Sequence, residues 1–258
     1  ERTAQGDDVY KDGETVPMGI DTATVDGKSF ENLVIGGDAS VVVNDTETEV
    51  VATLTVDKTT VTEGGDVTYT VTLTNKAGLP MESHGPLTFT LSDGTKISVK
   101  AGETTGTAVV QTTNDVFTGG QPSLVNKLVG VDGADDFEKL TLDPKEHTTT
   151  VTDQPTGEGD KVTVSITGDG PVFENQAQKF TVSVSQKLDH DLTVTLKNGA
   201  VVVIKAGELS VPYERAAQGD DVYKDGETVP MGIDTATVDG KSFENLVIGG
   251  DASVVVND

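Results

Sequence analysis

The sequence predicts an all-β protein built of tandem Ig-like antiparallel β-sandwich modules in an extended rod, and three observations lead to this fold class. Short segments alternate apolar residues with threonine, serine or aspartate, which is typical of strands with one buried face. Glycine and aspartate clusters separate these segments at intervals of about ten residues. Finally, the first 45 residues return at Glu214–Asp258 with one difference, Thr3 against Ala216, an offset of 213 residues.

The near-copy indicates an array of repeats rather than a single domain. Asp115-Val116-Phe117 corresponds to Asp221-Val222-Tyr223, and Phe137–Leu140 corresponds to Phe243–Leu246, so the 213-residue period contains two diverged modules. We expect residues 1–45 to be the C-terminal part of a truncated Ig-like repeat, and residues 50–153 and 158–258 to be complete Ig-like repeats.

Within residues 1–45, strands are expected at Ala23–Val25, Asn32–Ile35 and Ala39–Val43, because Asp26-Gly27 and Gly36-Gly37 separate them as turns. The front strands of this module are missing, so its sheet edges should be exposed. We therefore expect possible strand exchange with another molecule through this part, besides contacts with neighbouring repeats of the same chain.

The two complete modules show the clearest alternation. Val67, Tyr69, Val71 and Leu73 are separated by threonines in the first, and the second follows the same scheme around Phe180–Val184. No window has a helical apolar stripe of sufficient length. Tryptophan and cysteine are absent, so the cores depend on Val, Leu and Ile, and neither disulfides nor thiolate metal sites are available.

The charge balance limits the classes of partner. Eighteen basic and 43 acidic residues give a net charge of −25. This charge excludes a nucleic-acid binder that contacts the phosphate backbone, and it disfavours adsorption to anionic membranes. The sequence contains no apolar run long enough for membrane insertion. A strongly acidic surface does suit divalent cations.

Acidic residues gather at the two predicted junctions between modules. Carboxylates about 4 Å apart repel by about 4 kcal/mol at an effective dielectric of 20, so such a junction should stay open until a cation binds. Ca²⁺ prefers these hard oxygen ligands, although acidic turns are also commonly just solvated. The candidate junction ligands are Asp45, Glu47, Glu63, Asp153, Glu158 and Glu174.

A second group of candidate calcium ligands lies in the loop that recurs along the chain, and its spacing is not that of an EF-hand. A solvated loop explains it equally well. Its members are Asp7, Asp8, Asp115, Asp220 and Asp221.

The sequence does not indicate an enzyme. His84, His147 and His190 are isolated, and neither a G-x-S-x-G elbow nor a Walker loop is present. Carboxylates are so abundant that a glycosidase pair cannot be singled out. We expect no catalytic activity.

The motif Asp26-Gly27…Phe30-Glu31-Asn32-Leu33…Gly36, its copy from Asp239 to Gly249, and the closing Val-Val-Asn-Asp resemble the tandem extender repeats of giant RTX-type adhesins. These belong to the biofilm and ice-binding adhesins of Gram-negative bacteria. The resemblance implies a non-catalytic stalk on the extracellular cell surface, stiffened by junction Ca²⁺. By position, the ligands would include Asp45 with Glu63, and Asp153 with Glu174. Pro155 is in only one linker, so the two junctions differ.

Two functions therefore remain open. The first is an extender that projects a distal ligand-binding region from the cell. The second is an adhesive Ig-like module that itself binds a carbohydrate or a host protein through its loops.

Overall fold

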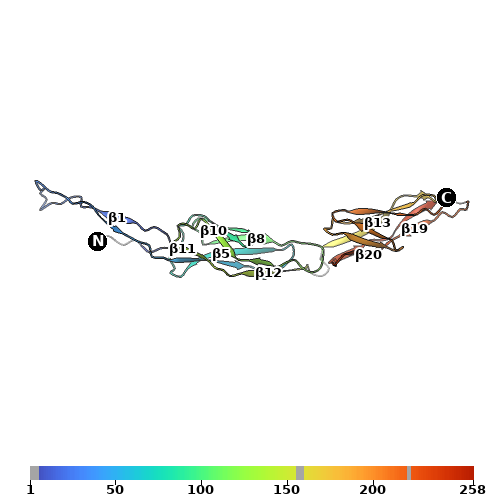
Figure 1. The fold of residues 1–258 in the computed structure, drawn as a ribbon, viewed down its shortest axis with the longest axis horizontal. Helices are drawn as coiled ribbons and strands as arrows, with labels where there is room; N and C mark the ends of the chain where they lie inside the picture. Colours follow the sequence, from blue (N-terminus) through green and yellow to red (C-terminus); the bar gives the residue numbers. More distant parts are fainter. Residues whose placement is uncertain (1–5, 155–159, 220–221) are drawn as a thin grey trace. The chain divides into compact units, whose positions relative to one another are not determined.

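The structure, a computed structural model, describes residues 6–154, 160–219 and 222–258. All regular elements in these ranges are β-strands (Figure 1). The described residues contain no helix with the length and apolar character that crossing a bilayer would require. The predicted fold class, all-β with antiparallel sandwich modules, is confirmed.

The first complete repeat forms three sheets. A four-stranded sheet has the order β11-β3-β5-β8, and two three-stranded sheets have the orders β10-β6-β7 and β4-β12-β9. The strands are β3 (Glu49–Val56), β4 (Thr60–Thr62), β5 (Asp66–Asn75), β6 (Leu87–Leu91), β7 (Lys96–Val99), β8 (Thr105–Gln111), β9 (Leu124–Asn126), β10 (Leu128–Asp132), β11 (Lys139–Leu142) and β12 (His147–Thr152).

The second repeat has the same topology, with sheets of order β18-β15-β13-β21, β17-β16-β20 and β14-β22-β19. Each of its strands has a counterpart in the first repeat in the same position. The strands are β13 (Lys161–Gly168), β14 (Val172–Phe173), β15 (Gln178–Val184), β16 (Leu192–Leu196), β17 (Val201–Ile204), β18 (Ser210–Arg215), β19 (Thr228–Met231), β20 (Ile233–Val238), β21 (Asn245–Ile248) and β22 (Ala252–Asn257).

The cores are formed by the alternation seen in the sequence. In β5 the residues Val67, Tyr69, Val71 and Leu73 are at most 2% exposed, and the threonines between them lie on the other face. Facing sheets of the second repeat pack in the same way around one apolar cluster. Each fully buried side chain of this kind contributes roughly 1.5–3 kcal/mol.

Most neighbouring strands are antiparallel, but each repeat has a parallel pair beside its first long strand. β11 runs parallel to β3, with Leu140 opposite Val50, and β21 runs parallel to β13, with Leu246 opposite Val162. Parallel strands start at the same edge of a sheet. The turn before β11 or β21 is therefore held beside the start of its repeat.

The first 45 residues fold only in part like their copy. The strands β1 (Thr15–Met18) and β2 (Ala39–Val42) pair in the same register as β19 and β22. The expected strand at Ala39–Val43 is thus confirmed. The expected strands at Ala23–Val25 and Asn32–Ile35 are wrong, since only the isolated bridge of Val25 with Lys28 forms there.

The reason is the missing partner strands. In the second copy β20 pairs with β16, and β21 pairs with β13. No described strand plays these parts for residues 6–45. Consequently Met18 is 58% exposed whereas its counterpart Met231 is 3% exposed, and Ile20 is 66% exposed whereas Ile233 is 4% exposed.

Contacts between residues divide the chain into two compact units. The first comprises the described residues of Glu1–Val61, Asp66–Gln111 and Ser123–Thr150, and the second those of Thr62–Gly65, Thr112–Pro122 and Val151–Asp258. The loops and strand ends that finish the first complete repeat thus belong to the second unit. Strands β4 and β12 of the first complete repeat, and β14 and β22 of the second, finish at the same end of their repeat. We call this end the tip of the repeat.

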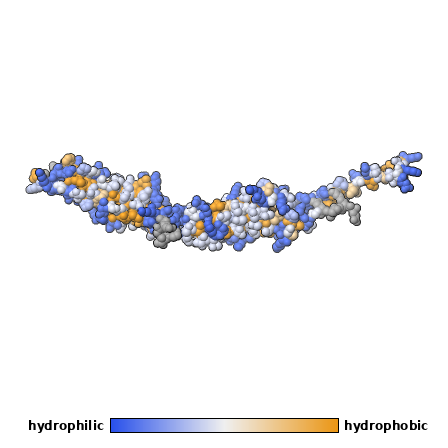
Figure 2. Space-filling model, turned by 180° about the vertical axis from the view of Figure 1, so that it is seen from behind, coloured by the Kyte–Doolittle hydropathy of each residue, from blue (hydrophilic) through white to orange (hydrophobic). Residues whose placement is uncertain are grey.

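Many of the exposed large apolar residues lie in residues 18–42, among them Ile20, Val34 and Val41. The face drawn in Figure 2 is mostly hydrophilic or neutral, and its hydrophobic residues lie in small separate patches. The net charge of −25 makes copies of the chain repel one another.

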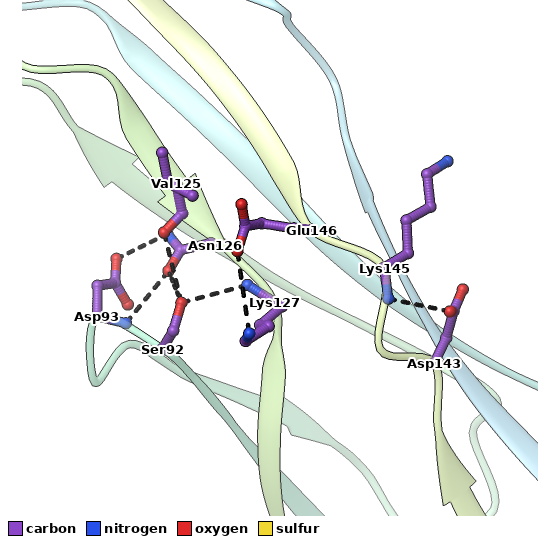
Figure 3. Close-up of polar contacts among 8 residues, drawn as sticks. All are labelled: Ser92, Asp93, Val125, Asn126, Lys127, Asp143, Lys145 and Glu146. Carbon is purple, nitrogen blue, oxygen red and sulfur yellow. Dashed lines mark hydrogen bonds and ion pairs between the residues drawn. The ribbon is translucent and has the colours of Figure 1, made fainter.

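A buried asparagine fixes the β6–β7 hairpin (Figure 3). Asn126, 1% exposed, donates through Nδ2 to Oδ2 of Asp93 (2.8 Å), and its Oδ1 accepts from Ser92 Oγ (3.1 Å) and from Asp93 N (3.2 Å). Burial alone would raise the pKa of Asp93. Hydrogen bonds from the backbone of Thr95 and the side chain of Asn126 together outweigh this effect, so the pKa lies below its ordinary value.

Replacing this asparagine should destabilise the protein. Asn126→Ala leaves the Asp93 carboxylate and the Ser92 hydroxyl without their buried partner, so we expect a loss of about 1–3 kcal/mol in unfolding free energy. Urea denaturation measures it. Asn198→Ala, at an exposed asparagine of the corresponding β16–β17 turn, is the matched control with a smaller expected loss. Equal losses in the two variants would contradict a special role for Asn126.

Candidate metal centre

Strand pairing at the tip of the first complete repeat brings Glu63 and Asp153 together. Glu63 follows β4, Asp153 follows β12, and the Glu63 amide donates to the carbonyl oxygen of Thr152 (2.9 Å). Val61 and Val151, the buried residues of these strand ends, hold the two strands against the core. Both carboxylates therefore leave the sheet at the same edge.

A third carboxylate, Glu244, reaches the same place from the turn before β21. Its amide donates to the carbonyl oxygen of Val116 (3.0 Å), and its Oε2 accepts from the amide of Asp160 (3.3 Å). One carboxylate oxygen from each of Glu63, Asp153 and Glu244 lies within 4.8 Å of the others. All three residues belong to the second compact unit.

The three acids are incompletely neutralised within the described part of the chain. Glu63 is 3% exposed, and its Oε2 accepts hydrogen bonds from the amide of Asp115 (3.1 Å) and from Nε2 of Gln121 (3.4 Å). Oε1 of Glu63 and Oε1 of Glu244 are buried and accept none from the described residues. A buried carboxylate oxygen without a donor is unfavourable unless a proton or a cation compensates it.

The electrostatics of the group point the same way. Desolvation by burial, followed by the neighbouring Glu63 carboxyl group, raises the pKa of Glu244 above its ordinary value. The hydrogen bond from Asp160 opposes this only in part. Ionised side chains at this site therefore repel one another in the absence of a positive charge.

The donor set fits Ca²⁺. Calcium–oxygen distances are about 2.3–2.6 Å, so two ligands of one ion are at most about 5 Å apart. The three oxygens lie within 4.8 Å of one another and can therefore bind the same ion. Calcium also takes six to eight oxygens in flexible geometry, so three carboxylates leave room for water or carbonyl groups. Histidine and thiolate, which softer metals prefer, do not belong to the group.

A second group of the same kind lies at the tip of the second repeat. Glu174, Asp225 and Asp258 have carboxylate oxygens within 4.8 Å of one another. Here β14 runs parallel to β22, and the Glu174 amide donates to the carbonyl oxygen of Asn257 (3.0 Å), as the Glu63 amide does to that of Thr152. Asp258 Oδ1 accepts from the amides of Asp225 (2.9 Å) and Gly226 (2.6 Å).

In the first unit, the acidic residues of the recurring loop meet the end of β2. Asp7, Asp8, Asp12, Asp45 and Glu138 line one hollow. Oε2 of Glu138 accepts from the amide of Thr48 (2.6 Å), as Glu244 does from Asp160. The hollow therefore repeats part of the arrangement at Glu63, Asp153 and Glu244.

The structure pairs the predicted ligands differently from the expectation. Glu63 lies with Asp153, not with Asp45, and Glu174 lies with Asp258, not with Asp153. The reason is that β14 runs parallel to the last strand of its own repeat, and β4 occupies the same place beside β12. Each turn glutamate therefore faces the tip of its own repeat.

Other predicted ligands have other surroundings. Glu47 is exposed and forms an ion pair with Lys139 (3.2 Å). Oδ1 of Asp8 accepts from the amide of Tyr10, and Oδ1 of Asp115 from that of Phe117, both at 2.7 Å. Glu158, Asp220 and Asp221 lie outside the described residues.

Sequence reasoning missed five acidic residues of these groups: Asp12, Glu138, Asp225, Glu244 and Asp258. The recurrence of Phe-Glu at Phe30, Phe137 and Phe243 was the signal that could have identified two of them. Its position beside the start of each repeat follows only from the parallel β11–β3 and β21–β13 pairs.

The fold and these groups define a tandem array of β-sandwich repeats with acidic tips. The LapA domain model matches residues 49–154 and 160–258. The chain therefore belongs to the LapA domain family, a large family of adhesins, and is an adhesin module of the cell surface or extracellular space. No protein with a curated description matches it.

Three solved structures are similar to this chain at low identity. The D0-D1 domain of intimin has 17% identity, with 80% of this chain and 97% of that one covered, and a TM-score of 0.26. FdeC, an Escherichia coli adhesin, has 12% identity, coverages of 86% and 69%, and a TM-score of 0.24. The fibronectin(III)-like modules of Clostridium thermocellum CbhA have 14% identity, coverages of 79% and 93%, and a TM-score of 0.21.

The raised pKa of Glu244 predicts a pH effect in metal-free protein. The stabilisation that comes from the raised pKa of Glu244 is fully present below pH 4.5, the ordinary pKa of this group. It is lost as the pH rises through the raised pKa of the folded state. Glu244→Gln cannot ionise. In chelator, the melting temperature of the natural protein should therefore fall relative to this variant between acid and neutral pH. A difference that stays constant or moves the other way would contradict the assignment.

Proposed function

We propose that the chain is a non-catalytic extender segment of an RTX-type adhesin on the surface of a Gram-negative bacterium. In this role Ca²⁺ at the repeat tips stiffens the array, so that a distal ligand-binding region is projected from the cell, as in biofilm adhesins. One observation carries the proposal: Glu63 and Asp153 belong to the first family-matched segment and Glu244 to the second, yet their carboxylate oxygens lie within 4.8 Å.

The residues perform distinct parts of this function. Glu63 and Asp153 are fixed by the β4–β12 strand ends, and Glu244 by its backbone hydrogen bond to Val116. When bound, the ion supplies the positive charge that three neighbouring carboxylates require. Release of the ion restores their mutual repulsion, which favours separation of the turn that carries Glu244 from the tip that carries Glu63.

The support for a non-catalytic role is membership of an adhesin family with this sandwich fold. The acidic groups also lie on turns that finish or precede strands, where they serve the contact between successive repeats. In such arrays, stability and reach depend on nearest-neighbour contacts.

Calcium should stabilise the protein through these carboxylates. For a dissociation constant of about 10⁻⁴ to 10⁻³ M, typical of extracellular modules, about 5 mM Ca²⁺ adds about 1–2 kcal/mol. Glu63→Gln should lose most of this gain yet be no less stable in chelator, since a repulsive charge is removed. Differential scanning calorimetry with and without Ca²⁺ measures both. Glu47→Gln, at the exposed ion pair with Lys139, should keep the gain; equal calcium responses in the two variants would refute the site.

Calcium should also restrict motion between repeats. Small-angle X-ray scattering of the natural chain should show a narrower distribution of maximum dimensions in Ca²⁺ than in chelator, because the bound ion couples Glu63 and Asp153 to Glu244. Glu63→Gln should resemble the chelated protein under both conditions. Identical profiles of the natural protein with and without Ca²⁺ would exclude stiffening.

A further inference from the structure

A tripeptide of aspartate, valine and an aromatic residue makes the same contact in both compact units. In the first unit Tyr10 forms an antiparallel bridge with Phe137; the Glu138 amide donates to the carbonyl oxygen of Val9 (2.9 Å), and the Lys11 amide to that of Asp136 (2.8 Å). The Tyr10 and Phe137 rings are 5.3 Å apart, and Val9 is completely buried.

The second unit repeats this contact with the tripeptide Asp115-Val116-Phe117. Phe117 bridges Phe243, the Glu244 amide donates to the carbonyl oxygen of Val116 (3.0 Å), and the two rings are 5.1 Å apart. Val116 is 9% exposed and Phe117 4% exposed. We call the valine and the aromatic residue of the tripeptide the apolar plug, and the turn that carries the Phe-Glu pair the Phe-Glu turn. In both units the apolar plug packs against the Phe-Glu turn.

The third copy of the tripeptide ends in the described residues Val222 and Tyr223, which are 89% and 72% exposed. Their sequence is the same as that of Val9 and Tyr10. The change in burial of the valine from 0% to 89% therefore reflects what lies against it and not its own chemistry.

Near Val222, the close backbone approach at Gly226 is formed as at Gly13 in the first copy. A Cβ at Gly226 would lie 2.9 Å from the carbonyl oxygen of Val256 and 3.3 Å from Asp258 Oδ1, and Gly13 has the same closeness to Val43 and Asp45, at 2.9 and 3.1 Å. Only glycine fits so close a backbone approach. The backbone just after the exposed Val222 and Tyr223 therefore already makes the close approach found at Gly13.

We propose that Val222 and Tyr223 are a docking surface for the Phe-Glu turn of a further repeat of the 50–153 type. The proposal extends the proposed function to the end of the second repeat and rests on it only for the tandem arrangement. Docking covers Val222, pairs its carbonyl group with the incoming glutamate amide, and adds that glutamate to Glu174 and Asp258.

The hydroxyl group of the tyrosine identifies the type of repeat. Tyr10 accepts a hydrogen bond from the amide of Ser83 (3.2 Å) beside Phe137, and burial raises its pKa above the ordinary value despite backbone hydrogen bonds that lower it. Phe117, which has no hydroxyl group, instead meets Phe243, His190 and Lys241. A tyrosine plug therefore matches the Phe137 turn, and a phenylalanine plug the Phe243 turn.

The test lengthens the chain after Asp258 by a second copy of residues 46–153, the segment that follows Asp45. Since Lys11 N donates to Asp136 O at the existing contact, the Lys224 amide should become protected. We expect its hydrogen exchange, measured by NMR in Ca²⁺, to slow at least about tenfold relative to the 258-residue chain. Unchanged exchange would overturn the proposal.

Two variants of the extended chain test the residues. Val222→Asp places a charge where the plug must be desolvated, so it should restore fast exchange; persistent protection would overturn the proposal. Val34→Asp, at a valine 85% exposed, is the control and should keep the protection. An attached copy of residues 158–258 that protects Lys224 as well would refute the assigned type of repeat.

A different measurement tests the proposed calcium function. It shows in the response of Glu63→Gln to Ca²⁺ at the existing group, which does not involve Lys224. If the Lys224 amide is protected but the natural protein and Glu63→Gln respond equally to Ca²⁺, the docking surface is supported and calcium binding at Glu63 is rejected.

Discussion

The pairing of a two- or three-residue strand with the last strand of the same repeat determines where the charges of this molecule gather. The hydrogen bond of the Glu63 amide to Thr152, and that of Glu174 to Asn257, place a glutamate beside the aspartate that ends each repeat. The β-ladder cannot form without bringing the two acids to the same edge. Hydrophobic burial at Val61 and Val151 thus stabilises an arrangement that electrostatics opposes.

A second parallel pairing determines what meets that edge. Because β21 runs beside β13, the turn before it carries Glu244 to the start of the second repeat, and its amide bonds to Val116. The contact between tip and turn combines two interactions of different character. The buried valine and the aromatic pair depend little on salt or pH, whereas the three carboxylates depend on protons and cations.

The all-β fold class could be predicted because its signals are local. Alternation in β5 and turns such as Asp93-Gly94 need only neighbouring residues to be recognised. Glu63, Asp153 and Glu174 could be identified as acidic groups near chain junctions, but their partners could not. The pairing of Glu63 with Asp153 depends on which strand lies beside β4, and Glu244 is 91 residues further along the chain. Strand exchange through residues 1–45 stays a prediction.

The near-identical copies show why such partners escape a reading of the sequence. Ile20 and Ile233 have the same neighbours in sequence, yet one is 66% exposed and the other 4%. The apolar residues of the copy form strands only where β13 and β16 supply hydrogen-bonding edges, so this strand structure is a property of the pair of segments. The same reasoning applies to Val9 and Val222. The contacts of Val9 with Glu138 and of Val116 with Glu244 therefore each place buried apolar residues beside a group of acids, whose mutual repulsion depends on protons and cations.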